Sequence, residues 1–327
     1  MFAMEMIESA AKISLFVEAA RLYYEHGYSQ QKIANKLGLS RPGVSRILRQ
    51  ARKQGIIRIE IIDPTGRGTY LESQLQQRFH LKKVIVVPNE GVPSTVIKQR
   101  LGEAAAHYLD QLIMEGTILG VSWGTTMQEV AKHLRPRRVR NMKVVQLNGG
   151  ISRAEYDTHA GEIAQRIAEN YQAIPFLLPL PAIVDQASLK EAILADRNIS
   201  RTLKLAQKSE IAVFTAGAFG YDSVLVKADY FDREEIEFLL KNKAVADICS
   251  RIITTSGEIC WPELDERTIG IELSELSQKK YAIAVAGGKK KLPAIYAGLL
   301  GKHFNVLITD EMVANEILDR STDAAKR

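Results

Sequence analysis

The spacing of apolar residues changes along the chain and divides it into two parts. Up to about residue 55, apolar side chains recur every three or four residues, which is the spacing of amphipathic helices. Beyond residue 82, short β-branched runs alternate with segments of helix length. The Pro- and Gly-rich residues 63–68 lie between the two patterns. We therefore predict a small domain over residues 1–63, a linker or oligomerisation segment over 64–82 and a larger domain over 83–320.

Two short periodic segments in the first part are separated by a single sharp turn. The first, Gln30–Leu37, follows Ser29, a residue type that caps helix N-termini, and the second covers residues 40–54. Gly38 can take the positive φ that the turn requires, and the small side chain of Ala34 lets two helices approach closely. This is the residue spacing of a helix-turn-helix motif.

Further elements flank this pair of helices. Residues 13–25 have the periodicity of another helix whose apolar face would pack on the pair. Residues 56–62 are β-branched and alternate in part, which indicates a short strand or wing. Together these segments predict a winged helix-turn-helix domain.

Positive charge is concentrated in this motif. The net charge of the whole chain is only +6, but the segment from Tyr28 to Arg58 holds eight Lys or Arg residues and no Asp or Glu. The remainder of the chain therefore has more acidic than basic residues. A charge run alone is typical of a solvated face, but here the charge lies on a stereochemical template that fits the major groove of DNA. We predict that double-stranded DNA is a partner.

The second helix of such a motif enters the major groove with its N-terminal residues at the base edges. We expect Arg41, Ser45 and Arg46 to reach base edges, and Arg49 and Arg52 to meet phosphates. The start of the first helix can offer backbone N–H groups to a phosphate. The predicted DNA-binding residues are Ser29, Gln30, Ser40, Arg41, Pro42, Ser45, Arg46, Arg49, Arg52 and Lys53.

The second part alternates strand and helix. The predicted strands are residues 83–87, 117–123, 142–147, 176–180, 211–214, 281–286 and 305–308, and the clearest helices are 94–112 and 126–134. Strands separated by helices indicate a largely parallel sheet covered on both faces. The predicted fold class is α/β, with a winged helix-turn-helix followed by a Rossmann-like domain.

Small, hydroxyl-bearing and basic residues follow three of these strands. They are the segments Val121-Ser-Trp-Gly-Thr-Thr126, Asn148-Gly-Gly-Ile-Ser152 and Gly287-Gly-Lys-Lys-Lys291. Ligands of open parallel sheets bind beyond the carboxyl ends of the strands. Open backbone N–H groups and a cation suit a phosphate, so we predict a phosphorylated ligand. The alternative for any one of these segments is a plain turn.

One segment also fits a catalytic motif. Gly120-Val-Ser-Trp-Gly124 matches the Gly-x-Ser-x-Gly nucleophile elbow, with Asp247 and His303 following in the chain order of a hydrolase triad. However, no glycine run for an oxyanion hole precedes it, and nothing around His303 marks a catalytic loop. We therefore predict that Ser122 is not a nucleophile and that the protein is not an enzyme.

The helix-turn-helix followed by VSWGTT, LNGGIS, LPLPAIVD, AVADICSR and AGGKKK resembles the SorC family of bacterial sugar-responsive transcriptional regulators. The resemblance runs from about residue 15 to residue 318 and is closest to the deoxyribonucleoside-responsive members of Gram-positive bacteria. It implies an effector domain with the fold of sugar-phosphate isomerases, used for sensing.

The resemblance also implies a function. It implies a homo-oligomer, a dimer or tetramer, that represses a sugar or deoxyribonucleoside catabolic operon. A phosphorylated sugar such as deoxyribose 5-phosphate would act as effector and release the DNA. No cofactor and no metal are expected. The alternative is an active sugar-phosphate isomerase joined to a DNA-binding domain.

Carried over by position, the resemblance assigns residues to the effector site. Ser122, Gly124, Thr125 and Thr126 would line the phosphate end, Lys291 would meet the phosphate or a ring oxygen, and Asp247 would accept from sugar hydroxyls. The other candidates are Gln146, Asn148, Gly149, Gly150, Asp185, Arg251 and Gly288. A helix cap or salt bridge is the alternative for Asp247, and a surface ion pair is the alternative for Asp185 and Arg251.

Position 148 departs from part of the family. Some members carry a lysine there, which could form an imine with an open-chain sugar. Asn148 cannot form an imine. We therefore expect reversible hydrogen bonding of the effector in place of covalent capture.

Three further expectations follow from the remaining sequence. Residues 70–79 have apolar positions at helical spacing and could relay effector binding to the DNA-binding domain; a helix docked on its own domain is the alternative. Cys249 and Cys260 form no disulfide framework. The N-terminal segment has acids where a signal peptide has a basic region, so we expect a cytoplasmic protein with no membrane segment.

Overall fold

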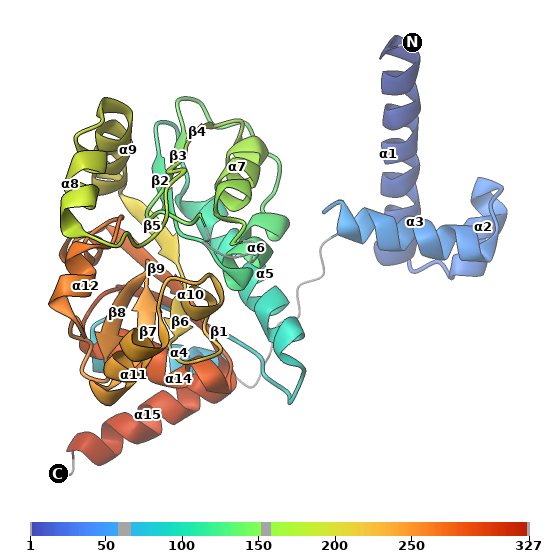
Figure 1. The fold of residues 1–327 in the computed structure, drawn as a ribbon. Coiled ribbons are helices and arrows are strands. Elements are labelled where there is room, and N and C mark those ends of the chain that lie inside the picture. Colours follow the sequence, from blue (N-terminus) through green and yellow to red (C-terminus); the bar gives the residue numbers. More distant parts are fainter. Residues whose placement is uncertain (1, 58–66, 152–157, 326–327) are drawn as a thin grey trace. The chain divides into compact units, whose positions relative to one another are not determined.

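The computed structural model describes residues 2–57, 67–151 and 158–325, and the side chains of 12–52, 54–57, 68–151 and 158–321. The chain forms two compact units, Met1–Pro64 and Thr65–Arg327 (Figure 1). We call them the N-terminal unit and the C-terminal unit.

The described part of the N-terminal unit, residues 2–57, contains the helices α1 (Phe2–Tyr24), α2 (Gln30–Leu37) and α3 (Arg41–Lys53). The side chain of Ser29 accepts from the N–H of Lys32, and the side chain of Ser40 accepts from the N–H of Gly43. Between α2 and α3, Gly38 has φ 65°, the left-handed conformation that favours glycine. The small core consists of Ala19, Leu22, Ile33, Ala34, Val44 and Leu48. The predicted helix-turn-helix is confirmed, and residues 58–62 of the predicted wing lie outside the described residues.

A seven-stranded sheet forms the centre of the C-terminal unit. Its strands, from one edge to the other, are β1 (Lys83–Val87), β10 (Val306–Asp310), β9 (Tyr281–Val285), β5 (Ile211–Phe214), β2 (Ile118–Val121), β3 (Lys143–Gln146) and β4 (Ile174–Phe176). Each neighbouring pair is parallel. The predicted α/β fold is confirmed. The predicted strand 176–180 is wrong in position, because β4 ends at Phe176 and the Leu178 N–H is bonded to a side chain.

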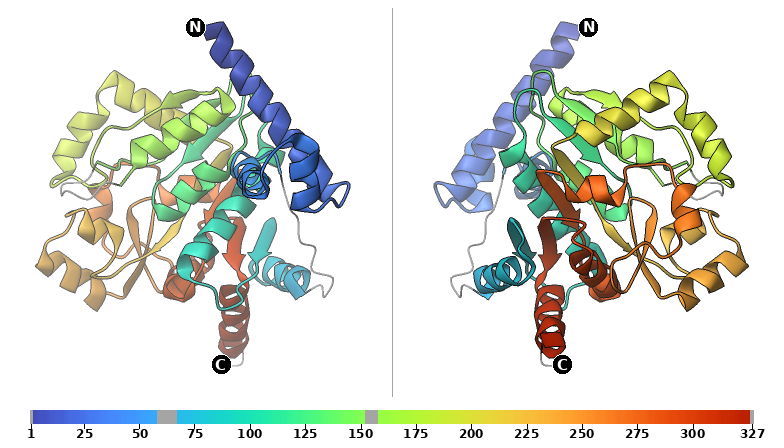
Figure 2. Two further views of the ribbon diagram at one scale, coloured as in Figure 1. Left: turned by 90° about the vertical axis from the view of Figure 1, so that its right-hand side faces the viewer. Right: turned by 90° about the vertical axis from the view of Figure 1, so that its left-hand side faces the viewer.

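Helices cover both faces of this sheet (Figures 1 and 2). In β5, Ile211 and Val213 pack into one hydrophobic cluster, and Ala212 and Phe214 pack into another. The helices are α4 (Arg67–Phe79), α5 (Ser94–Leu112), α6 (Thr125–His133), α7 (Ala160–Tyr171), α8 (Ala187–Leu194), α9 (Arg197–Lys208), α10 (Val224–Lys227), α11 (Arg233–Lys241), α12 (Pro262–Glu266), α13 (Leu273–Ser277), α14 (Leu292–Leu300) and α15 (Glu311–Ala325), and Lys289–Lys291 form a 3-10 turn. Over the described ranges, no helix has the length and apolarity needed to cross a membrane.

The sequence did not predict a second, smaller sheet. It is antiparallel and consists of β6 (Ala216–Ala218), β7 (Ala244–Ile248) and β8 (Arg251–Thr254). A two-residue turn, Cys249-Ser250, joins β7 to β8, with φ angles of 51° and 69°. Such a turn normally uses Asn and Gly, because other side chains are strained by roughly 1 kcal/mol or more in this conformation.

The segment predicted as a linker contains α4, which docks on its own unit. Leu71 and Leu75 of α4 are buried. Its Glu72 and Gln76 side chains accept from the N–H groups of Val86 (3.0 Å) and Val84 (3.1 Å). These bonds give partners to backbone N–H groups on the outer edge of β1. Unpaired N–H groups at the edge of a sheet would otherwise be available to pair with another chain.

Candidate functional site

The strand order reverses between β2 and β5. From β2 the chain proceeds outward through β3 to β4, whereas β5 lies on the other side of β2 and leads toward β9 and β10. The carboxyl ends of parallel strands at such a switch point form the usual ligand crevice of doubly wound folds. The segments that follow β2, β3, β5 and β9 meet here.

Lys291 is the cation of this crevice. Its Nζ lies 2.8 Å from Thr215 Oγ1, after β5, and 3.2 Å from Thr126 Oγ1, in the first turn of α6. Burial, followed by the charge of Lys98, lowers the pKa of Lys291 to about 8, while Asp247 acts in the opposite direction. The ammonium therefore stays protonated at neutral pH beside the N-terminus of α6, where an anion is stabilised.

Two glycines shape the backbone around Lys291. Gly124 precedes α6 with φ 121°, and Gly288 precedes the 3-10 turn with φ 87°. The N–H of Gly288 donates to the buried carboxylate of Asp310 at 2.6 Å, and Asn89 donates to the other oxygen of that carboxylate. Asp310, at the end of β10, thereby fixes the loop that carries Lys291.

Asp247 enters the crevice from the antiparallel sheet. Its Oδ1 accepts from the N–H of Ser250 at 3.1 Å. A Cβ on Gly217 of β6 would lie 2.2 Å from Asp247 Oδ2, so only glycine leaves room for this carboxylate. Burial raises the pKa of Asp247 to about 6, and the bond to Ser250 and the charge of Lys291 lower it in part. Asp247 lies in β7, so it is not a helix cap, and its carboxylate is close enough to Lys291 for the two charges to interact.

Asn148 links three parts of the crevice. Its Oδ1 accepts from Ser122 Oγ at 2.9 Å, and its Nδ2 donates to Ser250 Oγ at 2.8 Å. Asn148 is only 1% exposed, and both the oxygen and the nitrogen of its buried amide have a hydrogen-bond partner. The carboxyl ends of β2 and β3 and the β7–β8 turn are thereby held together.

The bond to Asn148 also bears on the nucleophile elbow. Ser122 directs its hydroxyl proton to the amide oxygen of Asn148. His303 is engaged elsewhere, with its Nε2 2.6 Å from the carbonyl oxygen of Gly257. This arrangement supplies Ser122 with an amide partner and is not a catalytic triad.

Arg251 and Asp185, two further candidates from the resemblance, do not join the crevice residues Lys291, Asp247 and Asn148. Arg251 is 1% exposed and donates to the carbonyl of Ile271 at 2.8 Å and to the carboxylate of Glu272 at 2.7 Å. This surrounding gives Arg251 a structural role. Asp185 is exposed and lines a different cavity of about 300 Å³ together with Asp229 and Asp232.

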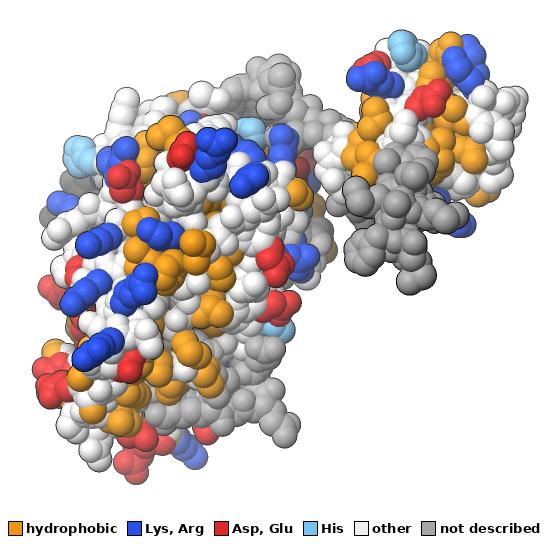
Figure 3. All heavy atoms as spheres, turned by 90° about the horizontal axis from the view of Figure 1, so that it is seen from above, with side chains coloured by type: hydrophobic (Ala, Val, Ile, Leu, Met, Phe, Trp, Pro, Cys, Tyr) orange, Lys and Arg blue, Asp and Glu red, His pale blue; other side chains and the backbone are white. Residues whose placement is uncertain are grey.

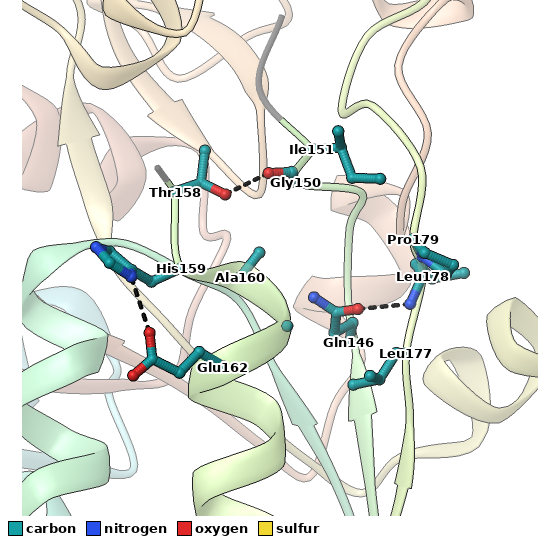
Figure 4. A pocket seen from close by; sticks show the side chains of 11 residues that line it. Gln146, Gly150, Ile151, Thr158, His159, Ala160, Glu162, Leu177, Leu178 and Pro179 are labelled. Carbon is teal, nitrogen blue, oxygen red and sulfur yellow. Dashed lines mark hydrogen bonds and ion pairs between the residues drawn. The ribbon is translucent and has the colours of Figure 1, made fainter. Parts of the chain in front are cut away.

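A larger cavity, of about 410 Å³, lies beside the crevice between β3, β4 and α7 (Figure 4). Its lining includes Gln146 and Gly150, two of the residues that the resemblance assigns to the effector site. Gly149 has a packing role, because a Cβ there would lie 2.3 Å from the carbonyl oxygen of Pro181. The other lining residues are Ile151, Thr158, His159, Ala160, Gly161, Glu162, Leu177, Leu178 and Pro179.

Thr215 and Ser250 contribute hydroxyls to the crevice but are not among the residues predicted from the sequence. Thr215 directly follows β5, so its place after a predicted strand was a usable signal. Ser250 belongs to the unpredicted hairpin, and its residue type gave no sign of the left-handed turn.

The N-terminal unit presents the predicted DNA-binding side chains on α3. Arg41, Arg46, Arg49 and Arg52 are exposed, whereas Val44 and Leu48 face the core. Ser29 and Ser40 serve as helix caps. The side chain of Lys53 lies outside the described residues.

Comparison with known proteins gives two family matches. Residues 63–319 match a family described as a sugar-binding domain, and residues 15–66 match a Crp-like helix-turn-helix domain.

Individual relatives cover nearly the whole chain. The Bacillus subtilis deoxyribonucleoside regulator is 40% identical, over 94% of this chain and 98% of its own length. The Klebsiella pneumoniae sorbitol operon regulator is 29% identical, over 95% of this chain and 100% of its own. The crystal structure of the full-length sorbitol operon regulator SorC superposes with a TM-score of 0.75 and 28% identity, over 94% of this chain and 98% of that one. These relatives are regulators and not enzymes, which confirms the prediction of a non-enzymatic protein.

Proposed function

This chain belongs to the SorC family of sugar-binding transcriptional regulators, and from that premise we propose that it is a repressor released from DNA by a phosphorylated sugar. The protein is a DNA-binding, sugar-responsive regulator. The proposal adds the direction of regulation, the class of effector and the residues that carry each task.

The N-terminal unit reads the DNA in this proposal. The start of α3 enters the major groove, where Arg41, Ser45 and Arg46 reach base edges. Arg49 and Arg52, further along the exposed face, meet phosphates and fix the register.

The C-terminal unit binds the effector. The observation that supports a phosphate is Lys291, a cation placed by the hydroxyls of Thr126 and Thr215 at the N-terminus of α6. Asp247, whose carboxylate lies near this cation, accepts from a sugar hydroxyl. We propose deoxyribose 5-phosphate as the effector, because the Bacillus subtilis relative is named a deoxyribonucleoside regulator.

Release requires more than one copy of the chain. Two recognition helices that read a two-fold site must stand about 34–36 Å apart or a multiple of this distance. An effector that binds a different subunit arrangement more tightly shifts the protein away from the DNA-binding arrangement. The loss of DNA affinity is limited by the ratio of the effector's affinities for the two arrangements. A homo-oligomer is consistent with exposed apolar side chains such as Ile174 and Leu189, and Figure 3 shows hydrophobic side chains gathered among Lys and Arg on one face of the C-terminal unit.

The test measures DNA release by the full-length protein. DNA fragments would be selected from a random pool by the protein itself, and their release would be titrated with deoxyribose 5-phosphate. We expect Lys291→Ala to keep DNA binding and lose most of the response to the sugar phosphate. Lys289→Ala, an exposed lysine two residues away, is the matched control and should respond like the parent. A Lys291→Ala protein that releases DNA at the parent's effector concentration would place the phosphate elsewhere.

A further inference from the structure

The two ends of the seven-stranded sheet differ in charge. The carboxyl ends of its parallel strands meet at the effector crevice, so the amino ends of the strands lie together at the opposite end of the sheet. The last residue of each strand and the six that follow it include three Lys, Lys291 among them, and four Asp or Glu, a net charge of −1. The first residue of each strand and the six that precede it include eleven Lys or Arg and four Glu, a net charge of +7. Cations are therefore concentrated at the end of the sheet away from the effector crevice.

Three of these eleven cations stabilise the fold. Arg78, Arg137 and the buried Lys279 each donate to backbone carbonyl groups of the C-terminal unit. Of the other eight, two are half-buried and six are exposed. We call the six exposed side chains the basic row: Lys82, Arg138, Arg140, Lys208, Lys280 and Lys302.

Backbone contacts join the segments that carry the basic row. Lys82 Nζ donates to the carbonyl of Lys280 at 2.7 Å, which links the start of β1 to the start of β9. The N–H of Lys82 donates to the carbonyl of Asn305, directly before β10. The N–H of Gly116, before β2, donates to the carbonyl of Arg140, before β3. Because neighbouring strands are about 4.8 Å apart, the five steps from β1 to β3 spread the row over about 24 Å.

Little negative charge balances the basic row. In the part of the chain that the structure describes, its one ion pair joins Lys280 Nζ to the Glu210 carboxylate at 3.5 Å, with side chains 57% and 70% exposed. Water and salt screen such an exposed pair. Arg138, Arg140 and Lys208 have no carboxylate within ion-pair distance among the described residues. A row of unpaired cations creates a positive potential that attracts a polyanion.

The composition of the basic row favours nucleic acid over protein as its partner. Protein interfaces are depleted in Lys and have apolar centres, whereas DNA interfaces are much more positively charged. The exposed apolar side chain at this end of β4, Ile174, lies beyond the row. The helix-turn-helix of the N-terminal unit binds DNA, and a duplex continues past the bases that such a motif reads. A length of about 24 Å corresponds to about seven base pairs of duplex.

We propose that the basic row is a second DNA-binding surface, which contacts phosphates of the duplex outside the site read by the N-terminal unit. Contacts with phosphates carry no sequence information, so this surface adds affinity without adding preference. The inference goes beyond the proposed function, because it requires neither the effector nor the role of Lys291.

One triple variant of the full-length protein tests this surface. It combines Arg138→Gln, Arg140→Gln and Lys208→Gln, three exposed side chains that make no ion pair or side-chain hydrogen bond within the described ranges. The substitutions remove three positive charges and keep side chains of similar length. Circular dichroism and thermal unfolding would check that the variant folds like the parent.

A second triple variant is the matched control for net charge. It combines Lys227→Gln, Lys241→Gln and Lys289→Gln, three exposed lysines that do not precede a strand of the seven-stranded sheet. Each protein would be titrated, at several salt concentrations, with two duplexes. One contains only the DNA site selected by the parent, and the other extends this site on both sides by unrelated sequence of about two helical turns, about 20 base pairs.

We expect the parent to bind the longer duplex more tightly than the shorter one, and the basic-row variant to lose this gain. On the longer duplex, its slope of log affinity against log salt should fall by about 2.7 for each protomer bound, about 0.9 for each of three lost phosphate contacts. The control variant should keep the gain and the slope. On the shorter duplex, all three proteins should bind alike, because the N-terminal unit is unchanged.

Two results would overturn the inference. The first is equal affinity of the parent for the two duplexes, or a basic-row variant that keeps the parent's salt slope on the longer one. The second is a basic-row variant that sediments without DNA as a smaller species than the parent and the control, because the row would then bind a second copy of the chain. Release of DNA by deoxyribose 5-phosphate is measured separately, so either result leaves the proposed effector site standing.

Discussion

Lys291 Nζ lies 2.8 Å from Thr215 Oγ1, although the two residues are 76 positions apart in the chain. The contact arises because β5 and β9 are neighbouring parallel strands, with Phe214 opposite Ala284. The segments that follow the two strands therefore leave the sheet at the same edge. The hydroxyl of Thr215 fixes the position of the cation before any ligand arrives.

Removing this hydroxyl should weaken effector binding. In Thr215→Val the side chain keeps its shape, but Lys291 loses a hydrogen-bond partner and becomes less ordered. We expect the dissociation constant for deoxyribose 5-phosphate to rise roughly fivefold, which corresponds to about 1 kcal/mol for one such bond. Calorimetric titration measures this change. Thr215→Ser restores the hydroxyl and should recover most of the affinity; equal loss in both variants would point to packing as the cause.

Effector affinity should fall in alkaline solution. Burial lowers the pKa of Lys291 to about 8, so raising the pH through this value removes its proton and its charge. We expect affinity for a sugar phosphate to weaken about tenfold between pH 7 and pH 9, because only the protonated lysine attracts the phosphate dianion. Arginine stays protonated over this range, so Lys291→Arg should give a nearly constant affinity. The same decline in Lys291→Arg would show that another group titrates.

The sequence predicted the helix-turn-helix pair almost residue by residue, whereas the preceding helix α1 begins at Phe2 and not at the predicted residue 13. Gln30–Leu37 is a helix with the predicted bounds, and Ser29, Gly38 and Ser40 act as caps and turn. Short-range stereochemistry decides these features, so the local sequence is sufficient. The strands Lys83–Val87 and Ile211–Phe214 also have the predicted bounds, because each is a β-branched or apolar run between clear stops.

Features that depend on distant residues were missed or misread. The strand β6, Ala216–Ala218, has no β-branched residue, and it forms because it pairs with β7. A charged residue such as Arg251 suggests a surface or ligand role, but the Glu272 carboxylate and the Ile271 carbonyl hold it in the interior. No local pattern predicts such partners.

Asn148 should be essential for the stability of the C-terminal unit. Asn148→Ala leaves the hydroxyls of Ser122 and Ser250 without their buried partner. We expect the free energy of unfolding to fall by about 2–4 kcal/mol, the cost of unsatisfied buried polar groups. Urea denaturation followed by circular dichroism measures this loss. Asn198→Ala, on the exposed face of α9, should change stability by less than about 0.5 kcal/mol, and a similarly small change in Asn148→Ala would contradict the linking role.

Two exposed arginines of α3 should affect DNA binding in different ways. Arg46 lies near the start of the helix and Arg52 near its end, so the first is placed for base edges and the second for phosphates. We expect Arg46→Ala to reduce the preference for the selected DNA over unrelated DNA by about 1–3 kcal/mol.

Arg52→Ala should instead weaken binding to both DNAs alike and reduce the slope of log affinity against log salt by about 0.9, because one phosphate contact is lost. Fluorescence anisotropy at several salt concentrations measures affinity, preference and slope together. Identical profiles for the two variants would mean that α3 does not lie in the groove with its N-terminal end toward the bases, because that orientation alone separates a base-reading arginine from a phosphate-binding one.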